Sequence, residues 1–314
     1  MLKQLDRCKL TSLLEKISVN YDLQVPIILA DGTRQLGRYA GGPIELTGKK
    51  LQRKPTSYFF PQTELMLTMT ETGEILSPPD GHKPLALCGL DRADLAALKF
   101  LDRFFGAPPA DDLYLRRRQG ALLIGVTGFA GPEGEFLPVA NGDCDVELIA
   151  TGQDWLAVGY SAAAPALLNN FTDAAAERLT SFQQSSAVQS TVQEKLHQAS
   201  RLLQEEKVPD SFWEEIATRC ILCCGCNLAC PTCSCFCVQD RKTVNGTERS
   251  RVWDSCQLDA FMREASGHNP LGTEALRTRR RIHHKLVADV VRWGELGCVA
   301  CGRCDRACPT GIGM

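Results

Sequence analysis

The residues whose types and spacing point most clearly to chemistry are cysteines. The chain has 314 residues and 16 cysteines, and residues 220–237, "CILCCGCNLACPTCSCFC", hold eight of them. One set has the spacing C-x2-C-x2-C-x3-C before a proline: Cys220, Cys223, Cys226 and Cys230. A second set repeats this spacing, again before a proline: Cys298, Cys301, Cys304 and Cys308. Thiols in such repeated sets bind metals or exchange electrons.

Disulfide bonds are not the expected use of these thiols. Residues 1–17, "MLKQLDRCKLTSLLEKI", lack the apolar core and small-residue cleavage site of an export signal. No run reaches the roughly 18 apolar residues that span a bilayer. We therefore expect a soluble, cytoplasmic protein without an integral membrane segment, in which reductants keep cysteines as thiols. Metal binding is the remaining explanation.

The repeated spacing predicts two 4Fe-4S clusters with crossed ligands. In two-cluster bacterial ferredoxins, the fourth cysteine of each motif ligates the other cluster. The first cluster is predicted on Cys220, Cys223, Cys226 and Cys308. The second is predicted on Cys298, Cys301, Cys304 and Cys230. A pair of zinc sites is the alternative, but two C-x2-C pairs would suffice for zinc and the other cysteines would lack a role.

Eight cysteines remain outside these two sets. A third metal site is one interpretation of the five in the last third of the chain: Cys224, Cys233, Cys235, Cys237 and Cys256. Packing as small, buried apolar side chains is the default expectation for them. The same expectation applies to Cys8, Cys88 and Cys144.

The first part of the chain mixes helix and strand signals. A helix is expected near residues 2–17, and another over 91–106, with Asp91 as its N-cap and Gly106 at its end. Strands are expected on both sides of the turn at Asp31 and Gly32, at 84–90 and at 121–128, with a hairpin over 145–160. These signals indicate an α+β N-terminal domain over residues 1–165, interpreted as a docking or scaffold domain.

Helical patterns dominate the rest. Residues 166–207 are interpreted as a helical connector, followed by an α-helical ferredoxin-like dicluster domain over 208–314. A capping box at Ser211 and Glu214 is expected to begin a helix that ends near Cys220. The segment between the motifs is expected to be helical rather than a pair of short β-hairpins. A helix over 273–296 is expected to face a core with Leu276, Ile282, Leu286, Val290 and Val291.

Charge narrows the possible partners. The net charge is −2, which gives no electrostatic case for nucleic acid as a partner. From Val208 onward there are 14 Lys and Arg against 12 Asp and Glu, a small surplus that partly offsets the formal charge of two cubanes. The basic run over 277–285 either raises a cluster potential, docks an acidic partner or forms a solvated helix face. The sequence has no nucleotide-binding glycine motif.

Four segments carry a resemblance to a known family. They are "FWEEIATRCILCCGCNLACPTCSCFCVQD", "RVWDSCQLDAFMREASGHNP", "RTRRRIHHK" and "CVACGRCDRACPTGI". They resemble the iron-sulfur proteins that include the beta subunits of hydrogenase/sulfur reductases and the iron-sulfur subunit of anaerobic sulfite reductase. The likeness extends weakly to "SYFFPQTELML", "CGLDRADLAALKFLDRFF" and "DDLYLRRR". Many relatives have a Cys-Phe-Cys segment after the strand at 121–128, where this chain offers only Cys144.

The resemblance implies an electron-transfer subunit of an anaerobic, soluble oxidoreductase complex. Its expected partners are a flavin/NAD(P)-binding reductase subunit and a catalytic oxidoreductase subunit, of which a NiFe hydrogenase is one example. Two alternatives belong to other classes. The chain could reduce a thiol, disulfide or sulfur substrate directly, or it could act as a redox-sensing iron-sulfur protein.

Overall fold

The computed structural model describes residues 1–46, 50–78, 83–127, 142–152, 154–185 and 191–313. The chain divides into two compact units. Residues 1–59 and 81–189 form the first unit, and residues 60–80 and 190–314 form the second. Among the described residues, no helix is both long and apolar enough to cross a membrane.

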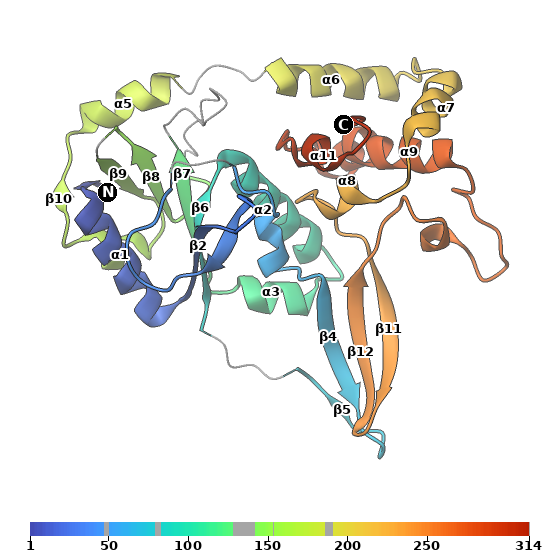
Figure 1. The fold of residues 1–314 in the computed structure, drawn as a ribbon, viewed down its shortest axis with the longest axis horizontal. Coiled ribbons are helices and arrows are strands. Elements are labelled where there is room, and N and C mark those ends of the chain that lie inside the picture. The colour runs from blue at the N-terminus through green and yellow to red at the C-terminus, as the bar shows by residue number, and fades with distance from the viewer. Residues whose placement is uncertain (47–49, 79–82, 128–141, 153, 186–190, 314) are drawn as a thin grey trace. The chain divides into compact units, whose positions relative to one another are not determined.

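The first unit is built on a mixed sheet. Eight strands of the described chain follow the order β10-β1-β9-β8-β7-β6-β2-β3 (Figure 1). The pairs β2–β6, β6–β7 and β7–β8 are parallel, and the other pairs are antiparallel. Its strands are β1 (Leu2–Leu5), β2 (Asp22–Ile28), β3 (Arg34–Arg38), β6 (Leu85–Leu90), β7 (Leu122–Thr127), β8 (Val146–Ala150), β9 (Trp155–Gly159) and β10 (Thr172–Asp173). Its helices are α1 (Arg7–Asn20), η1 (Pro55–Tyr58), α2 (Arg92–Gly106), α3 (Asp112–Arg118), α4 (Ala164–Leu168) and α5 (Ala176–Ser185).

Side chains that alternate along the strands give this sheet two buried faces. Helix α1 buries Leu10, Leu14 and Ile17 in the main core, which also contains Leu148 of β8. The next residue, Ile149, points to the opposite face and packs in the cluster that includes α5. The unit therefore has a substantial apolar core of its own.

Most elements predicted for this unit are confirmed, but the helix expected near residues 2–17 begins at Arg7, and Leu2–Leu5 form β1 instead. Asp91 caps α2 by accepting a 2.9 Å hydrogen bond from the backbone N–H of Asp94. Gly32 has φ +77° in the turn between β2 and β3, and it adopts this angle without steric strain because it has no Cβ. Strands β8 and β9 form the expected antiparallel hairpin.

The second unit combines helices with a small antiparallel sheet. The described strands follow the order β11-β12-β4-β5. They are β4 (Thr63–Met69), β5 (Ile75–Leu76), β11 (Phe236–Thr243) and β12 (Gly246–Trp253). Its helices are α6 (Thr191–Gln204), α7 (Asp210–Arg219), α8 (Gly225–Leu228), η2 (Asp259–Met262), α9 (Glu274–His283), the π-helical turn η3 (His284–Ala288), α10 (Asp289–Trp293) and α11 (Arg303–Ala307).

A long β-hairpin corrects the expectation that the segment between the cysteine motifs is helical. Strands β11 and β12 pair from Phe236 opposite Trp253 to Thr243 opposite Gly246, and the hairpin lies beside β4 (Figure 1). Most of β11 is exposed, so it lacks the apolar alternation that marks a half-buried strand. The dipeptide Asn245-Gly246 is a hairpin signal that the helical expectation did not take into account.

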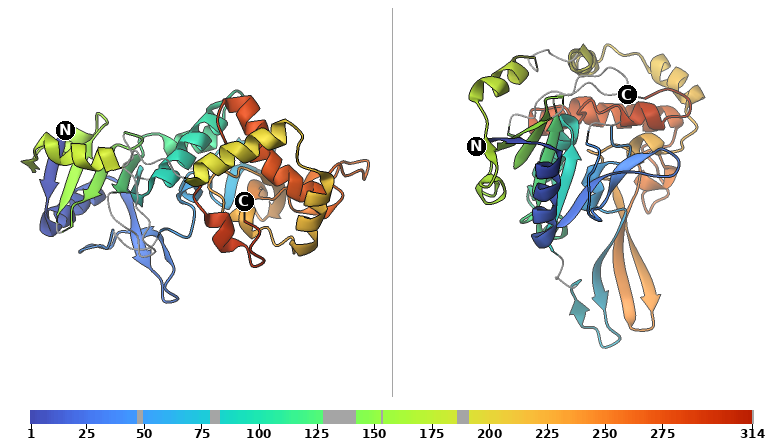
Figure 2. Two further views of the ribbon diagram at one scale, coloured as in Figure 1. Left: turned by 90° about the horizontal axis from the view of Figure 1, so that it is seen from above. Right: turned by 60° about the vertical axis from the view of Figure 1, so that its left-hand side comes forward.

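The units also group the chain differently from the predicted ranges 1–165, 166–207 and 208–314. Residues 60–80 join the second unit because β4 pairs with β12. Helix α6, yellow in Figure 2, joins it too, because it is in contact with η3. There, Ser200 Oγ donates a 2.5 Å hydrogen bond to the carbonyl of Leu286. Long-range strand pairing decides the first of these assignments, and no local pattern in the sequence reports it.

The predicted capping box is wrong. Helix α7 starts after Pro209, so Pro209 rather than Ser211 is its N-cap, and this N-cap makes no side-chain hydrogen bond. The helix itself is confirmed, and Cys220 is its C-cap, so α7 positions the first cysteine as expected.

Candidate metal centre

Local backbone structure is the same in the two cysteine motifs. Leu222 and Ala300 occupy equivalent positions and have φ of 53° and 54°. Cys224 and Gly302 are also equivalent, have φ of 62° and 68°, and are the N-caps of α8 and α11. Left-handed residues within such turns direct successive backbone N–H groups to one side, which creates a concavity suited to an anionic cluster.

The two motifs approach each other closely. Helices α8 and α11 are in contact, and a Cβ added to Gly225 would lie 3.0 Å from the carbonyl oxygen of Ala307. That distance is tighter than ordinary van der Waals contact, so only glycine fits without a shift. The approach brings the end of the second motif beside the first, and a 2.6 Å hydrogen bond from Thr232 Oγ1 to the carbonyl of Gly297 links the end of the first motif to the start of the second.

Three other thiols lie near enough to Cys226 to change its pKa. Burial raises the pKa of Cys226, Arg281 opposes this shift, and the thiolates of three further cysteines raise that pKa by repulsion. These three are Cys220, Cys223 and Cys308. At Cys308, burial is outweighed by hydrogen bonds from Thr310 and from the backbone N–H groups of Gly313 and Ile312, which lower its pKa to about 7.

The other four thiols also form a group. Burial raises the pKa of Cys298 to about 11, and repulsion from Cys230 and Cys304 contributes to that shift. Burial likewise raises the pKa of Cys304 to about 11, with Cys230 and Cys301 among its neighbours. Thiols of each predicted set are thus near enough to repel one another electrostatically.

Helix α9 and its continuation bury charge rather than an apolar stripe, which corrects our expectation for this helix. Four residues spaced by four are buried, with 3–5% of each exposed: Arg277, Arg281, Lys285 and Asp289. Of the predicted core residues, Leu286 is buried, whereas Leu276 and Val291 are 41% and 79% exposed.

The π-helical turn η3 helps to keep this charged stripe on one side. Residues spaced by four drift by about 40° along an α-helix, because each residue turns about 100°. The wider turn of the π-helix rotates less per residue and offsets that drift between Arg281 and Asp289. Single π turns of this kind often occur at functional sites.

Arg281 lies between the two thiol groups. Its Nε donates a 3.1 Å hydrogen bond to Asn227 Oδ1, and its Nη1 donates a 2.9 Å hydrogen bond to the carbonyl of Gly313. Burial opposes its charge, but the thiolates of Cys226 and Cys304 outweigh burial and raise the pKa of Arg281. The charge of the basic run alone does not distinguish Arg281 from its neighbours. The spacing of 277, 281, 285 and 289 was the signal that could have singled out this residue.

These features fit a pair of anionic clusters. Buried cations lie near thiols of both motifs, and each motif contains a turn with left-handed residues. A 4Fe-4S cluster needs one thiolate at each of four irons. In the described part of the chain, no three His, Cys, Asp or Glu side chains are grouped to hold a single metal ion.

The remaining cysteines differ in their surroundings. Cys224 and Cys256 are buried, as expected for packing residues, and so are Cys88 and Cys144 in the first unit. Cys8 is exposed, so the packing expectation is wrong there. The other three are partly exposed: Cys233, Cys235 and Cys237.

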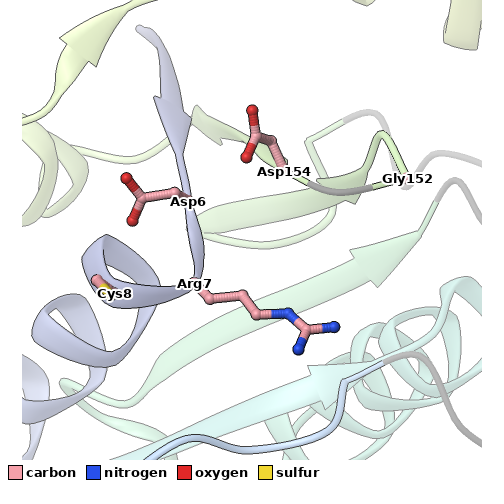
Figure 3. Close-up of a pocket in the computed structure, with 5 residues that line it drawn as sticks. All are labelled: Asp6, Arg7, Cys8, Gly152 and Asp154. Atoms are coloured by element: carbon pink, nitrogen blue, oxygen red, sulfur yellow. The ribbon is translucent and has the colours of Figure 1, made fainter.

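Cys8 also lines a surface pocket of the first unit (Figure 3). The other lining residues are Asp6, Arg7, Gly152 and Asp154. Asp6 serves as the N-cap of α1, and Asp154 Oδ2 accepts a 2.9 Å hydrogen bond from Gln4 Nε2. Both carboxylates therefore already have structural roles.

Comparisons with known proteins agree with the cysteine geometry. Residues 219–312 match the family described as a 4Fe-4S dicluster domain. Over 252 residues the chain is 29% identical to sulfhydrogenase 2 subunit beta of Pyrococcus furiosus, an alignment that covers 74% of this chain and 72% of that protein. No solved structure matches. The chain is therefore similar to a hydrogenase beta subunit, and its last third matches a 4Fe-4S dicluster domain, as the resemblance in its sequence predicted.

Proposed function

We propose that the chain holds two 4Fe-4S clusters and relays electrons between them. The first cluster is held by Cys220, Cys223, Cys226 and Cys308. The second is held by Cys298, Cys301, Cys304 and Cys230. The observation that carries this proposal is the grouping of Cys308 with the first motif and of Cys230 with the second. When bound, the clusters supply one-electron redox chemistry, and the protein sets their separation, hydrogen bonding and burial.

The relay operates, in this proposal, within a cytoplasmic oxidoreductase complex. A flavin/NAD(P)-binding subunit exchanges electrons with one cluster, and a catalytic subunit of the hydrogenase or sulfur/sulfite reductase type exchanges them with the other. The relationship to a sulfhydrogenase beta subunit supports this placement. The first unit, which has its own core, serves as the docking scaffold.

Iron and sulfide analysis tests the cofactor content. The chain purified without oxygen is expected to contain about eight irons and eight sulfides, because each cubane holds four of each. About four irons per chain would contradict the proposal of two clusters.

Replacement of Cys308 tests the crossed ligation. Cys308→Ala should damage the cluster held by Cys220, Cys223 and Cys226, and Cys230→Ala should damage the other, as resolved by electron paramagnetic resonance. Cys8→Ala, an exposed cysteine of the first unit, is the control that should retain both spectra. If Cys308→Ala altered only the cluster of its own motif, the assignment would be wrong.

Purification of the complex tests the partners. An affinity-tagged chain expressed in its own host should retain a flavoprotein and a catalytic oxidoreductase subunit. Electrons supplied as NAD(P)H should then reduce both clusters. Reduction of the clusters without any such partner would argue against a relay role.

One observation favours a second candidate, direct reduction of a disulfide or sulfur substrate. Cys256 accepts a 3.2 Å hydrogen bond from Asn227 Nδ2. A hydrogen bond from Cys235 outweighs burial and, with Asn227 and Lys285, lowers the pKa of Cys256 to about 6. Such a thiolate can attack a disulfide, and two electrons and two protons would then yield two thiols.

Cys256→Ser separates this candidate from the relay. If Cys256, with its hydrogen-bond partner Cys235, is catalytic, the variant should lose disulfide reduction driven by a chemical electron donor while it retains its iron. If the relay alone operates, electron transfer between the partner subunits should be unaffected.

A further inference from the structure

Lys285 connects the two ends of the second ligand set. Its Nζ donates a 2.9 Å hydrogen bond to Thr232 Oγ1 and also hydrogen-bonds the side chain of Cys230. Thr232 Oγ1 lies 3.3 Å from Cys230 Sγ and donates a 2.6 Å hydrogen bond to the carbonyl of Gly297. Gly297 precedes Cys298, and its N–H donates to the backbone carbonyl of Lys285 at 2.8 Å. This buried lysine thus fixes Cys230 relative to the start of the second motif.

The equivalent position in the other repeat has no such lysine. Thr310 follows Cys308 as Thr232 follows Cys230, and Thr310 Oγ1 lies 3.4 Å from Cys308 Sγ. Within the described residues, no Lys or Arg side chain donates a hydrogen bond to Thr310. The backbone of the two motifs is alike, but their surrounding charge is not.

Buried cations are concentrated on the second set. The positive charge of Lys285 attracts the thiolates of Cys230 and Cys298, and that of Arg303 attracts the thiolate of Cys301. The positive charge of Arg281 interacts with both sets, because it attracts the thiolate of Cys226 in the first set and that of Cys304 in the second.

Two carboxylates oppose these cations. Asp289 is buried, and its negative charge repels the thiolate of Cys230. Asp305 repels the thiolate of Cys304, but Asp305 is exposed, so solvent screens its charge. The buried charge around the second set is therefore more positive than the charge around the first. Reduction adds one negative charge to a cluster, and a buried cation stabilises that charge more strongly than it would in water.

We propose that Lys285 raises the reduction potential of the second cluster, on Cys230, Cys298, Cys301 and Cys304, above that of the first, which makes the second cluster the electron-accepting end of the relay. The inference rests on the two-cluster function proposed above. One electron leaves the reduced first cluster, which becomes oxidised, and the oxidised second cluster gains it.

Redox titration of Lys285→Met tests this role. In the full chain, purified without oxygen and followed by electron paramagnetic resonance, one of the two potentials should fall. The expected shift is at least tenfold in the reduction equilibrium, or about 59 mV for a one-electron couple. Lys285→Arg, which keeps the charge, should retain the higher potential. Lys242→Met removes an exposed lysine of β11 and should leave both potentials unchanged.

A pair of threonine variants identifies the affected cluster. Thr232→Val should shift the same cluster as Lys285→Met, whereas Thr310→Val should shift the other. If Lys285→Met loses iron, Lys285→Gln replaces it, because glutamine keeps a hydrogen-bond donor for Thr232 without the charge. The reduction potential of the second cluster should fall in Lys285→Gln as well.

The outcomes separate the two proposals. Two clusters whose potentials do not respond to Lys285→Met or Lys285→Gln would overturn the role of Lys285 and leave the relay standing. A shift in the cluster that responds to Thr310→Val would also overturn it. Fewer than two clusters in the unaltered chain would overturn the proposed function, and this inference with it.

Discussion

At the scale of single residues, cysteine spacing carried most of what could be predicted about the site. Repeated C-x2-C-x2-C-x3-C-P spacing is a local property of the sequence, and it fixes which thiols belong to a motif. The roles of Arg281 and Lys285 were not predictable in the same way. Both lie in a basic run whose polarity is typical of an exposed face, and only the fold shows that they are buried beside thiols.

Arg281→Met should weaken retention of both clusters. The change removes hydrogen bonds to Asn227 Oδ1 and to the carbonyl of Gly313, and it removes the cation shared by the two thiol groups. Hydrogen bonds of charged groups contribute about 1.5–3 kcal/mol each, so we expect a clear loss of iron per chain during exposure to a chelator. Arg279→Met is the matched control, since Arg279 pairs with Asp210 at the surface. Equal iron loss in both variants would contradict a specific role for Arg281.

At the scale of elements, a helix or strand could be predicted from the sequence when it has a buried face. The apolar runs of β6 and β7 and the Asp91 cap of α2 were recognised because burial and capping select particular residue types. Strand β11 was missed because both of its faces are largely exposed. It is stabilised instead by its pairing with β12, including an ion pair between Asp240 and Arg249, which lie directly opposite each other.

A buried ion pair joins β12 to β4 in addition to the backbone pairing of the two strands. Arg251 Nε donates a 2.5 Å hydrogen bond to Glu64 Oε2, and both side chains are at most 3% exposed. The guanidinium also lies over the rings of Phe60 and Phe236. Glu64→Ala should therefore lower the free energy of unfolding by about 3–5 kcal/mol, because it leaves a buried charge without its counter-ion.

Denaturant unfolding of the holoprotein measures this effect. Glu248→Ala, which breaks an exposed cross-strand pair with Arg241, is the control and should cost less than about 1 kcal/mol. Similar losses in the two variants would show that the buried pair does not hold β12 to β4.

At the scale of the whole molecule, the two units should differ in their dependence on the clusters. The first unit has a sheet with apolar clusters on both faces. In the second unit the residues around the thiols are largely polar or charged, and Arg281, Lys285 and Arg303 are buried there. Buried cations without their anionic partners are costly, so removal of iron should destabilise this unit selectively.

Hydrogen exchange of the chain before and after iron removal tests this expectation. Amides of α8, α9 and α11 should lose protection in the iron-free chain, whereas those of β6, β7 and β8 should keep it. The strands β11 and β12 should show an intermediate loss, because their pairing with each other and with β4 does not involve a cluster ligand. Loss of protection in both units together would mean that they unfold as one cooperative body and that the first unit is not an independent scaffold.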